Sequence, residues 1–139
     1  MTNLEKKIAA FKREAGDKSQ YTPEQQKIYS AFTKVNGAEV SVKVTDCEGV
    51  TMNVKLQASK EVRKILLKHY RGEKGTVSGR EILNMFDVMR TGSKSFNDGN
   101  YVYRKRYVKH GNVYFIVIKL FSNGKDAVLK SFYSNVGYK

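Results

Sequence analysis

The chain has 139 residues, enough for one domain around a single hydrophobic core, and 40% of them are apolar, including 9 Tyr and 7 Phe. Its 26 Lys and Arg outnumber its 13 Asp and Glu, and the formal charge of +13 predicts a polyanionic partner such as nucleic acid, an acidic protein or an anionic membrane surface. One cysteine excludes an intrachain disulfide, the absence of a His/Cys cluster argues against a structural zinc site, and no apolar stretch predicts a signal peptide or a membrane span.

Residues 1–36 form the first predicted unit, an N-terminal segment of two amphipathic helices. Apolar residues recur at helical spacing from Asn3 to Ala15, and Gly16 ends that helix. Thr22 caps the second helix, which runs on to an Asn-Gly stop. This segment carries few of the excess cations, since residues 1–57 hold 9 basic and 7 acidic side chains whereas the rest of the chain holds 17 and 6.

Residues 37–139 form the main predicted domain. Alternation of apolar residues predicts its strands, and helical spacing behind caps at Ser59 and Ser78 predicts two helices. The segment from Thr91 to Gly99, rich in Gly, Ser and Asn, is predicted to be a loop. In chain order the domain holds a hairpin over 38–57, helices over 59–71 and 78–90, and strands over 100–109, 112–121 and 126–134.

The last three strands predict an antiparallel meander. Both parities of the middle strand, from Val113 to Ile118, are apolar, so this central strand is expected to be covered on both faces. The predicted fold class is therefore α+β, an antiparallel sheet packed by helices, with an N-terminal helical segment and a β-hairpin. The sequence leaves open whether the hairpin continues the sheet.

The first strand of the meander is the candidate RNA surface. Period-two geometry places Tyr101, Tyr103 and Lys105 on one face and Arg104 and Arg106 on the other. Rings that stack on bases, interleaved with cations that bind phosphates, suit single-stranded RNA. The alternative is a solvated strand whose tyrosines only cover the sheet.

His69 is the candidate acid or base. It lies near the C-terminal end of a predicted helix, among Lys68, Arg71 and Lys74. An imidazole titrates near pH ~6.5, so it can take and return a proton near neutrality. The alternative is a helix-capping or core histidine, and the other histidine, His110, is expected to lie exposed in a turn without a role.

Two hydroxyls on the last strand, Ser131 and Tyr133, could bind a scissile phosphate or stabilise a pentacoordinate oxyanion. The carboxylates are scattered, with no pair for glycoside hydrolysis or for two-metal chemistry, and no Gly-rich phosphate loop is present. An enzyme with this sequence would therefore work without a metal and without a cofactor.

The helix Glu61–Tyr70, the helix Ser78–Met89 and the three strands that end in Lys130–Ser134 resemble a known superfamily. It is the superfamily that groups barnase, EndoU, colicin-type and RelE nucleases, and the resemblance is to its phage- or polymorphic-toxin-associated branch. It covers roughly residues 55–137. It implies a metal-independent endoribonuclease of toxin type that cleaves RNA through the 2′-hydroxyl to a 2′,3′-cyclic phosphate.

The resemblance also implies roles for residues. His69 would be the general acid or base, and Lys105 or Lys119 would supply the second charge, because His110 falls in a turn. The implied catalytic residues are His69, Lys105, Tyr133 and Ser131, and the implied substrate-binding residues are Lys68, Arg71, Tyr101, Tyr103, Arg104, Arg106 and Lys119.

The implied partners are RNA and an acidic immunity or antitoxin protein. The implied site of action is the cytoplasm, reached directly or by delivery from another cell or a phage as part of a larger protein. Two alternatives stay open: a non-catalytic nucleic-acid-binding module, and a phage- or secretion-associated interaction protein on the same fold.

Overall fold

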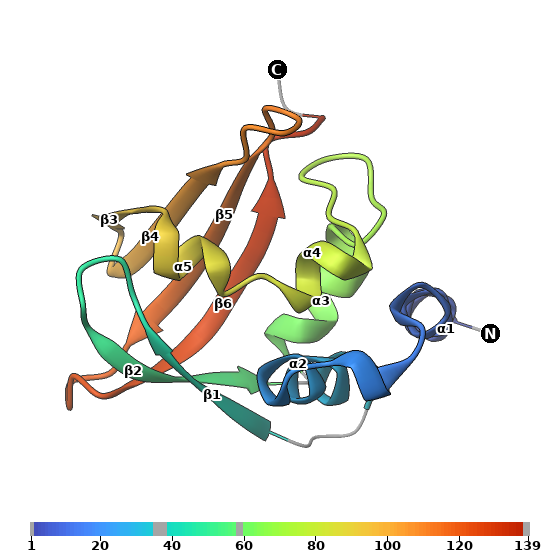
Figure 1. Cartoon of the computed structure of the whole chain (residues 1–139), viewed down its shortest axis with the longest axis horizontal. Helices are drawn as coiled ribbons and strands as arrows, with labels where there is room; N and C mark the ends of the chain where they lie inside the picture. The colour runs from blue at the N-terminus through green and yellow to red at the C-terminus, as the bar shows by residue number, and fades with distance from the viewer. Residues whose placement is uncertain (1, 35–38, 58–59, 138–139) are drawn as a thin grey trace.

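The computed structural model describes residues 2–34, 39–57 and 60–137 and shows a single mixed sheet with helices packed on it (Figure 1). The strand order is β1-β2-β6-β5-β4-β3, and every neighbouring pair is antiparallel except β2 and β6. The N-terminal hairpin thus continues the sheet, and the predicted α+β class is confirmed. The strands are β1 (Glu39–Thr45), β2 (Thr51–Gln57), β3 (Ser93–Asn97), β4 (Asn100–Arg106), β5 (Val113–Leu120) and β6 (Asp126–Ser134).

The helices begin at side-chain caps where the sequence predicts them at Thr22 and Ser78, both of which form capping boxes, and α1 begins at a further capping box on Thr2. The predicted cap at Ser59 and the predicted start of the hairpin at residue 38 lie outside the described residues. The helices are α1 (Asn3–Ala15), the 3₁₀ turn η1 (Lys18–Gln20), α2 (Pro23–Thr33), α3 (Glu61–Lys68), α4 (Gly79–Leu83) and α5 (Asp87–Thr91).

The predicted helix over residues 78–90 is wrong as one element, because α4 and α5 are separate. Asn84 ends α4 with φ −109° and ψ 17°, outside the helical region. Its side-chain amide donates to the carbonyl oxygen of Arg80 at 2.9 Å, a local bond of the kind that competes with continued helix. The break turns α5 across the sheet.

The predicted loop from Thr91 to Gly99 is also wrong in part, because it contains β3. Asn97 pairs with Asn100 across a two-residue turn in which Asp98 and Gly99 both have positive φ, 52° and 80°. That backbone conformation matches the right-handed twist of a hairpin. The polar residues of β3 lie on the edge of the sheet, where solvent replaces a second neighbour.

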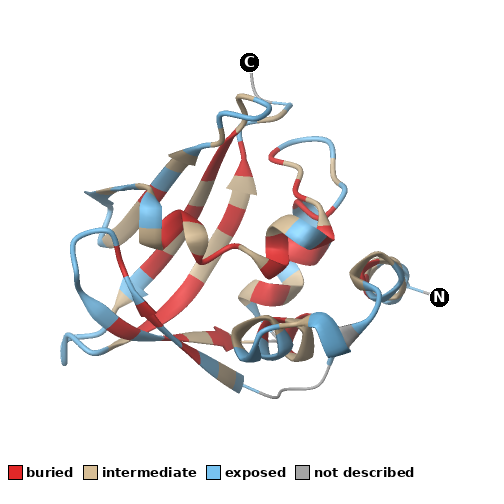
Figure 2. Ribbon diagram, in the orientation of Figure 1, coloured by how far each residue is buried: buried red, intermediate tan, exposed pale blue. Residues whose placement is uncertain are grey.

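The helices and one face of the sheet share one core (Figure 2). Phe11 of α1 and Phe32 of α2 are fully buried in the same cluster as Ile116 of β5 and Phe132 of β6. The N-terminal segment, predicted as a separate unit over residues 1–36, therefore packs into the core of the main domain.

The other face of the sheet is the open face, which no helix covers within the described chain. Along β5, Ile116 and Ile118 are buried whereas Phe115 and Val117 are only half-buried. The prediction that this strand is covered on both faces is therefore wrong for the face that carries Phe115 and Val117. Its apolar residues face the open side, where a neighbouring aromatic ring partly covers Phe115.

Candidate nucleic-acid interface

The open face carries cations around an aromatic pair. The strand register aligns Arg104 of β4 with Phe115 of β5, and Phe115 with Tyr133 of β6, so the three side chains share one face. Arg106 and Lys119 have the same parity, and both are exposed, as is Arg104. Three of the expected substrate-binding residues, Arg104, Arg106 and Lys119, thus lie on one uncovered surface with Tyr133, an expected catalytic residue.

The two rings of the aromatic pair, here called the platform, stack on each other. The rings of Phe115 and Tyr133 are 5.1 Å apart between centroids and inclined by 17°. Both rings are half-buried, with exposed cations on the same face of the sheet. Aromatic side chains beside cations are the groups with which proteins bind the bases and phosphates of single-stranded nucleic acids. Phe115 was not predicted as a site residue, because its neighbours on both sides are also apolar and the whole segment is typical of a buried strand.

His69 lies at the margin of this platform because α3 ends at Lys68 and His69 is its C-cap. The imidazole lies 5.5 Å from the Tyr133 ring, between centroids. Its Nδ1 is 3.0 Å from the carbonyl oxygen of Lys74. A carbonyl only accepts, so Nδ1 carries the proton and Nε2 keeps a lone pair, the form that can act as a base.

The environment of His69 favours the neutral ring. Burial lowers the pKa of His69, the hydrogen bond to Lys74 acts in the opposite direction, and the charge of Lys68 lowers the pKa further. His69 is 5% exposed overall, yet it lines an open hollow of about 450 Å³. The residues that line this hollow, here called the His69 hollow, are Lys68, His69, Phe115, Ser131, Tyr133, Ser134 and Asn135.

The loop that follows His69 is pinned to the end of β6. The Gly75 amide donates to the carbonyl oxygen of Val136 at 2.7 Å, and the Ser134 amide donates to the carbonyl oxygen of Gly75 at 3.2 Å. The Ser134 hydroxyl donates to the carbonyl oxygen of Thr76 at 2.6 Å. These bonds hold the Lys74 carbonyl, and through it the tautomer of His69, in place.

Glu14 of α1 supports the same loop from the opposite side. Its carboxylate accepts from the Tyr70 hydroxyl at 2.8 Å and from the Gly79 amide at 2.7 Å, and it pairs with the Arg71 guanidinium at 2.9 Å. Burial opposes ionisation of Glu14, but these donors outweigh it, and the pKa of Glu14 is lowered. Arg71, a predicted RNA-contact residue, is thus partly engaged with Glu14, although its side chain is exposed.

Tyr103 is placed differently from its prediction, since the structure does not leave its ring free to stack on a base. It is 0% exposed, and its hydroxyl donates to the Asp46 carboxylate at 2.6 Å. Lys94 pairs with the same carboxylate at 2.8 Å. Burial raises the pKa of Asp46, yet the bonds from Lys94, Tyr103 and two backbone amides outweigh it and lower that pKa to about 2. This network ties the β1–β2 turn to β3 and β4.

Tyr101 and Lys105 share the parity of Tyr103 and so lie on the helix-covered side. The Lys94 ammonium lies 4.5 Å from the centre of the Tyr101 ring. Lys105 donates to the Thr91 hydroxyl at 2.5 Å and lies 4.7 Å from the centre of the Tyr107 ring. Of the residues expected to be catalytic, His69 and Tyr133 thus lie together, whereas Lys105 lies on the other face of the sheet.

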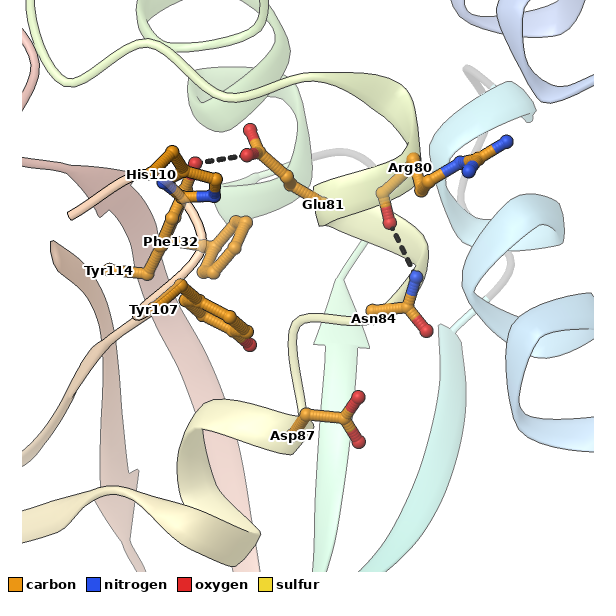
Figure 3. Close-up of a pocket in the computed structure, with 8 residues that line it drawn as sticks. All are labelled: Arg80, Glu81, Asn84, Asp87, Tyr107, His110, Tyr114 and Phe132. Atoms are coloured by element: carbon orange, nitrogen blue, oxygen red, sulfur yellow. Dashed lines mark hydrogen bonds between the residues drawn. The ribbon is translucent and has the colours of Figure 1, made fainter. Parts of the chain in front are cut away.

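A second hollow, of about 200 Å³, lies between α4, the start of α5, the turn that follows β4, and strands β5 and β6 (Figure 3). It was not predicted, because its residues come from segments that are far apart in the sequence and each has an ordinary local explanation: Glu81 completes a capping box and His110 occupies a turn. It is here called the Tyr107 pocket, and it is lined by Arg80, Glu81, Asn84, Asp87, Tyr107, His110, Tyr114 and Phe132.

Comparison with models of known families, with curated proteins and with solved structures finds no match to this chain. Within residues 2–34, 39–57 and 60–137, no three His, Cys, Asp or Glu side chains are grouped so that they could hold a metal ion. In the same residues, no helix has the length and apolar character needed to span a membrane.

Proposed function

We propose that this protein is a metal-independent endoribonuclease that binds single-stranded RNA on the open face of its sheet and cleaves it at His69. The observation that carries the proposal is the position of a base-competent imidazole beside a cationic aromatic platform. Nδ1 of His69 is committed to Lys74, and the ring lies against Tyr133, which itself stacks on Phe115. A nucleobase stacked on the platform would bring its ribose near the His69 hollow.

In the proposed reaction, Nε2 of His69 takes the proton of the 2′-hydroxyl as that oxygen attacks the adjacent phosphorus. The bond from phosphorus to the 5′-oxygen then breaks, and the 5′-oxygen takes a proton from the Tyr133 phenol or from water. The products are a 2′,3′-cyclic phosphate and a free 5′-hydroxyl.

Cations and a hydroxyl around the His69 hollow would stabilise the phosphorane. Lys68 and Ser131 line the hollow with His69, and Arg104 lies two strands away on the same face. Lys68 is exposed at the end of α3, so its ammonium can reach a phosphate in the hollow. In this proposal Lys68 and Arg104 neutralise the phosphorane, and Lys105, one of the cations expected to do so, lies on the helix-covered face.

The test uses an end-labelled single-stranded RNA in the presence of EDTA. The wild-type protein should cleave it to fragments that end in a 2′,3′-cyclic phosphate. The sharpest variant is His69→Asn, because an asparagine amide can still donate to the Lys74 carbonyl but cannot act as a base. We expect a loss of roughly 10²- to 10⁴-fold in the cleavage rate, with RNA affinity unchanged.

Equal rates for wild type and His69→Asn would refute the role of His69, and wild-type protein that leaves RNA intact would refute the nuclease proposal. The second candidate function, an RNA-binding module without catalysis, is favoured by one observation: His69 as a whole residue is only 5% exposed, as a structural histidine would be. RNA binding without cleavage would select it. Toxicity on expression in a bacterial host that His69→Asn abolishes would select the nuclease.

A further inference from the structure

The Tyr107 pocket has an aromatic wall. The Tyr107 and Tyr114 rings meet edge to face at 5.3 Å and 85°, and the His110 ring lies 6.0 Å from Tyr107, inclined by 28°. The Phe132 ring, 6.2 Å from Tyr114, closes the inner end. Figure 3 shows these rings gathered on one side of the pocket, with Asn84 and Asp87 on the opposite side.

The polar groups of the pocket include both donors and acceptors. Asp87 presents a carboxylate of which one oxygen accepts from Arg90 at 3.0 Å. Nδ1 of His110 accepts from the backbone amide of Asn112 at 3.2 Å. The proton of the neutral ring therefore lies on Nε2, which becomes a donor. Glu81 accepts from the Tyr114 hydroxyl and thereby links the aromatic wall to α4.

The lining of the pocket carries two carboxylates, Glu81 and Asp87, and one guanidinium, Arg80. Arg90 lies outside the lining and pairs with Glu24 as well as with Asp87, so it does not neutralise Asp87 alone. An anion would meet both carboxylates, whereas a ring with N–H donors can hydrogen-bond to them. A neutral, planar ring with N–H donors and acceptors at its edge fits this lining best.

The pocket and the proposed cleavage site both include residues from the C-terminal half of β6. A hollow of about 240 Å³ shares the lining residues Glu81 and Tyr114 with the pocket and is also lined by Arg71 and Val136. Asn135, the residue next to Val136, lines the His69 hollow. A strand of RNA that leaves the His69 hollow would thus pass an exposed arginine on its way to the pocket.

From this geometry we propose that the Tyr107 pocket receives one nucleobase of the RNA whose backbone lies on the open face. The base inserts against the aromatic wall, donates an N–H to Asp87 and accepts from Nε2 of His110. The pocket then gives the enzyme a base preference at a position outside the cleaved bond. This inference rests on the proposed function for its substrate, but the pocket can be tested by itself.

The test is an NMR titration with the four free nucleosides. Nucleosides carry no phosphate, so they do not bind through the cations of the open face. We expect at least one of them to shift the ring signals of Tyr107 and His110 while the signals of Phe115 and Tyr133 stay in place. Tyr107→Leu keeps apolar bulk but removes the ring, and it should abolish the shifts.

The matched control is Phe96→Leu, which removes an aromatic ring that is 64% exposed on β3, outside the pocket. It should leave the nucleoside shifts unchanged. The inference is overturned if no nucleoside shifts the signals of Tyr107 and His110, or if the shifts persist in Tyr107→Leu.

A cleavage assay separates this inference from the proposed function. Tyr107→Leu should raise KM for RNA roughly 10- to 100-fold, the usual effect of losing one stacked base, with kcat retained. RNA cleavage without nucleoside binding would overturn the base pocket and leave the nuclease standing. Nucleoside binding without RNA cleavage would support the base pocket and overturn the nuclease proposal.

Discussion

The Gly75→Ala substitution tests the structure of the His69 hollow directly. Gly75 has φ +67°, a conformation that costs an alanine roughly 1–2 kcal/mol. A Cβ atom there would lie 2.8 Å from Nδ1 of His69 and 3.1 Å from Cβ of Tyr133. Both distances are shorter than ordinary van der Waals contact, so the imidazole and the Tyr133 strand must move apart.

The expected cost has two parts. The crowding of a packed site costs about 1–3 kcal/mol, and the backbone conformation adds its own penalty, so the free energy of unfolding should fall by about 2–5 kcal/mol. A typical domain has about 5–15 kcal/mol in total, so the variant should still fold. Displacing the imidazole should also slow RNA cleavage, by up to roughly 10²-fold for a shift of about 1 Å.

Gly124→Ala is the matched control. Gly124 has φ +72°, nearly the value at Gly75, but a Cβ there meets nothing within 4 Å. Its free energy of unfolding should fall only by the cost of the backbone conformation, and it should cleave RNA at the wild-type rate. Urea unfolding measures both stabilities. Equal losses of stability in the two variants, with full cleavage by Gly75→Ala, would refute the packing described around His69.

Further predictions concern charge. Because burial and Lys68 lower the pKa of His69, the cleavage rate should fall on the acid side with a midpoint below pH ~6.5, and NMR titration of the imidazole should give the same midpoint. The stability that comes from the neutral imidazole is complete above pH ~6.5 and decreases as the pH falls towards the lowered pKa, a trend that urea unfolding across this range would detect. Because the pKa of Asp46 is lowered to about 2, its carboxylate stabilises the folded protein fully above pH ~4, and this stabilisation is lost as the pH falls towards 2. The variant Asp46→Asn should have a free energy of unfolding lower by about 2 kcal/mol at pH 7 and a weaker dependence of that free energy on acid pH. Lys119→Gln should reduce the slope of log affinity for RNA against log salt by about 0.7, whereas Lys12→Gln, on exposed α1, should leave it unchanged.

Much of the fold could be predicted because apolar periodicity and caps act locally. The strand β3 could not, because Ser93–Asn97 has no apolar alternation and is an edge strand paired on one side only. The turn signal Asp98-Gly99 was present in the sequence, and it indicates a hairpin once both flanking segments are considered as strands. The break between α4 and α5 depends on the single side chain of Asn84.

The candidate site could be predicted only in part, because the sequence does not show which face of a strand the helices cover. Alternation along β4 places Tyr103 and Arg104 on opposite faces but does not identify the covered one. The structure buries the tyrosine, whose hydroxyl has a partner in Asp46, and leaves the arginine in solvent. Lys105 follows the tyrosine to the covered side. His69, Ser131 and Tyr133 do meet, because α3 ends beside the second half of β6.

The most direct test of the account is an NMR titration with a single-stranded RNA that is 2′-O-methylated and therefore cannot be cleaved through its 2′-oxygen. We expect the largest shifts to fall on Phe115, Tyr133 and His69 at low salt and to weaken as salt is added. Shifts confined to the helices α1 and α2, or to the exposed ring of Phe96, would contradict it.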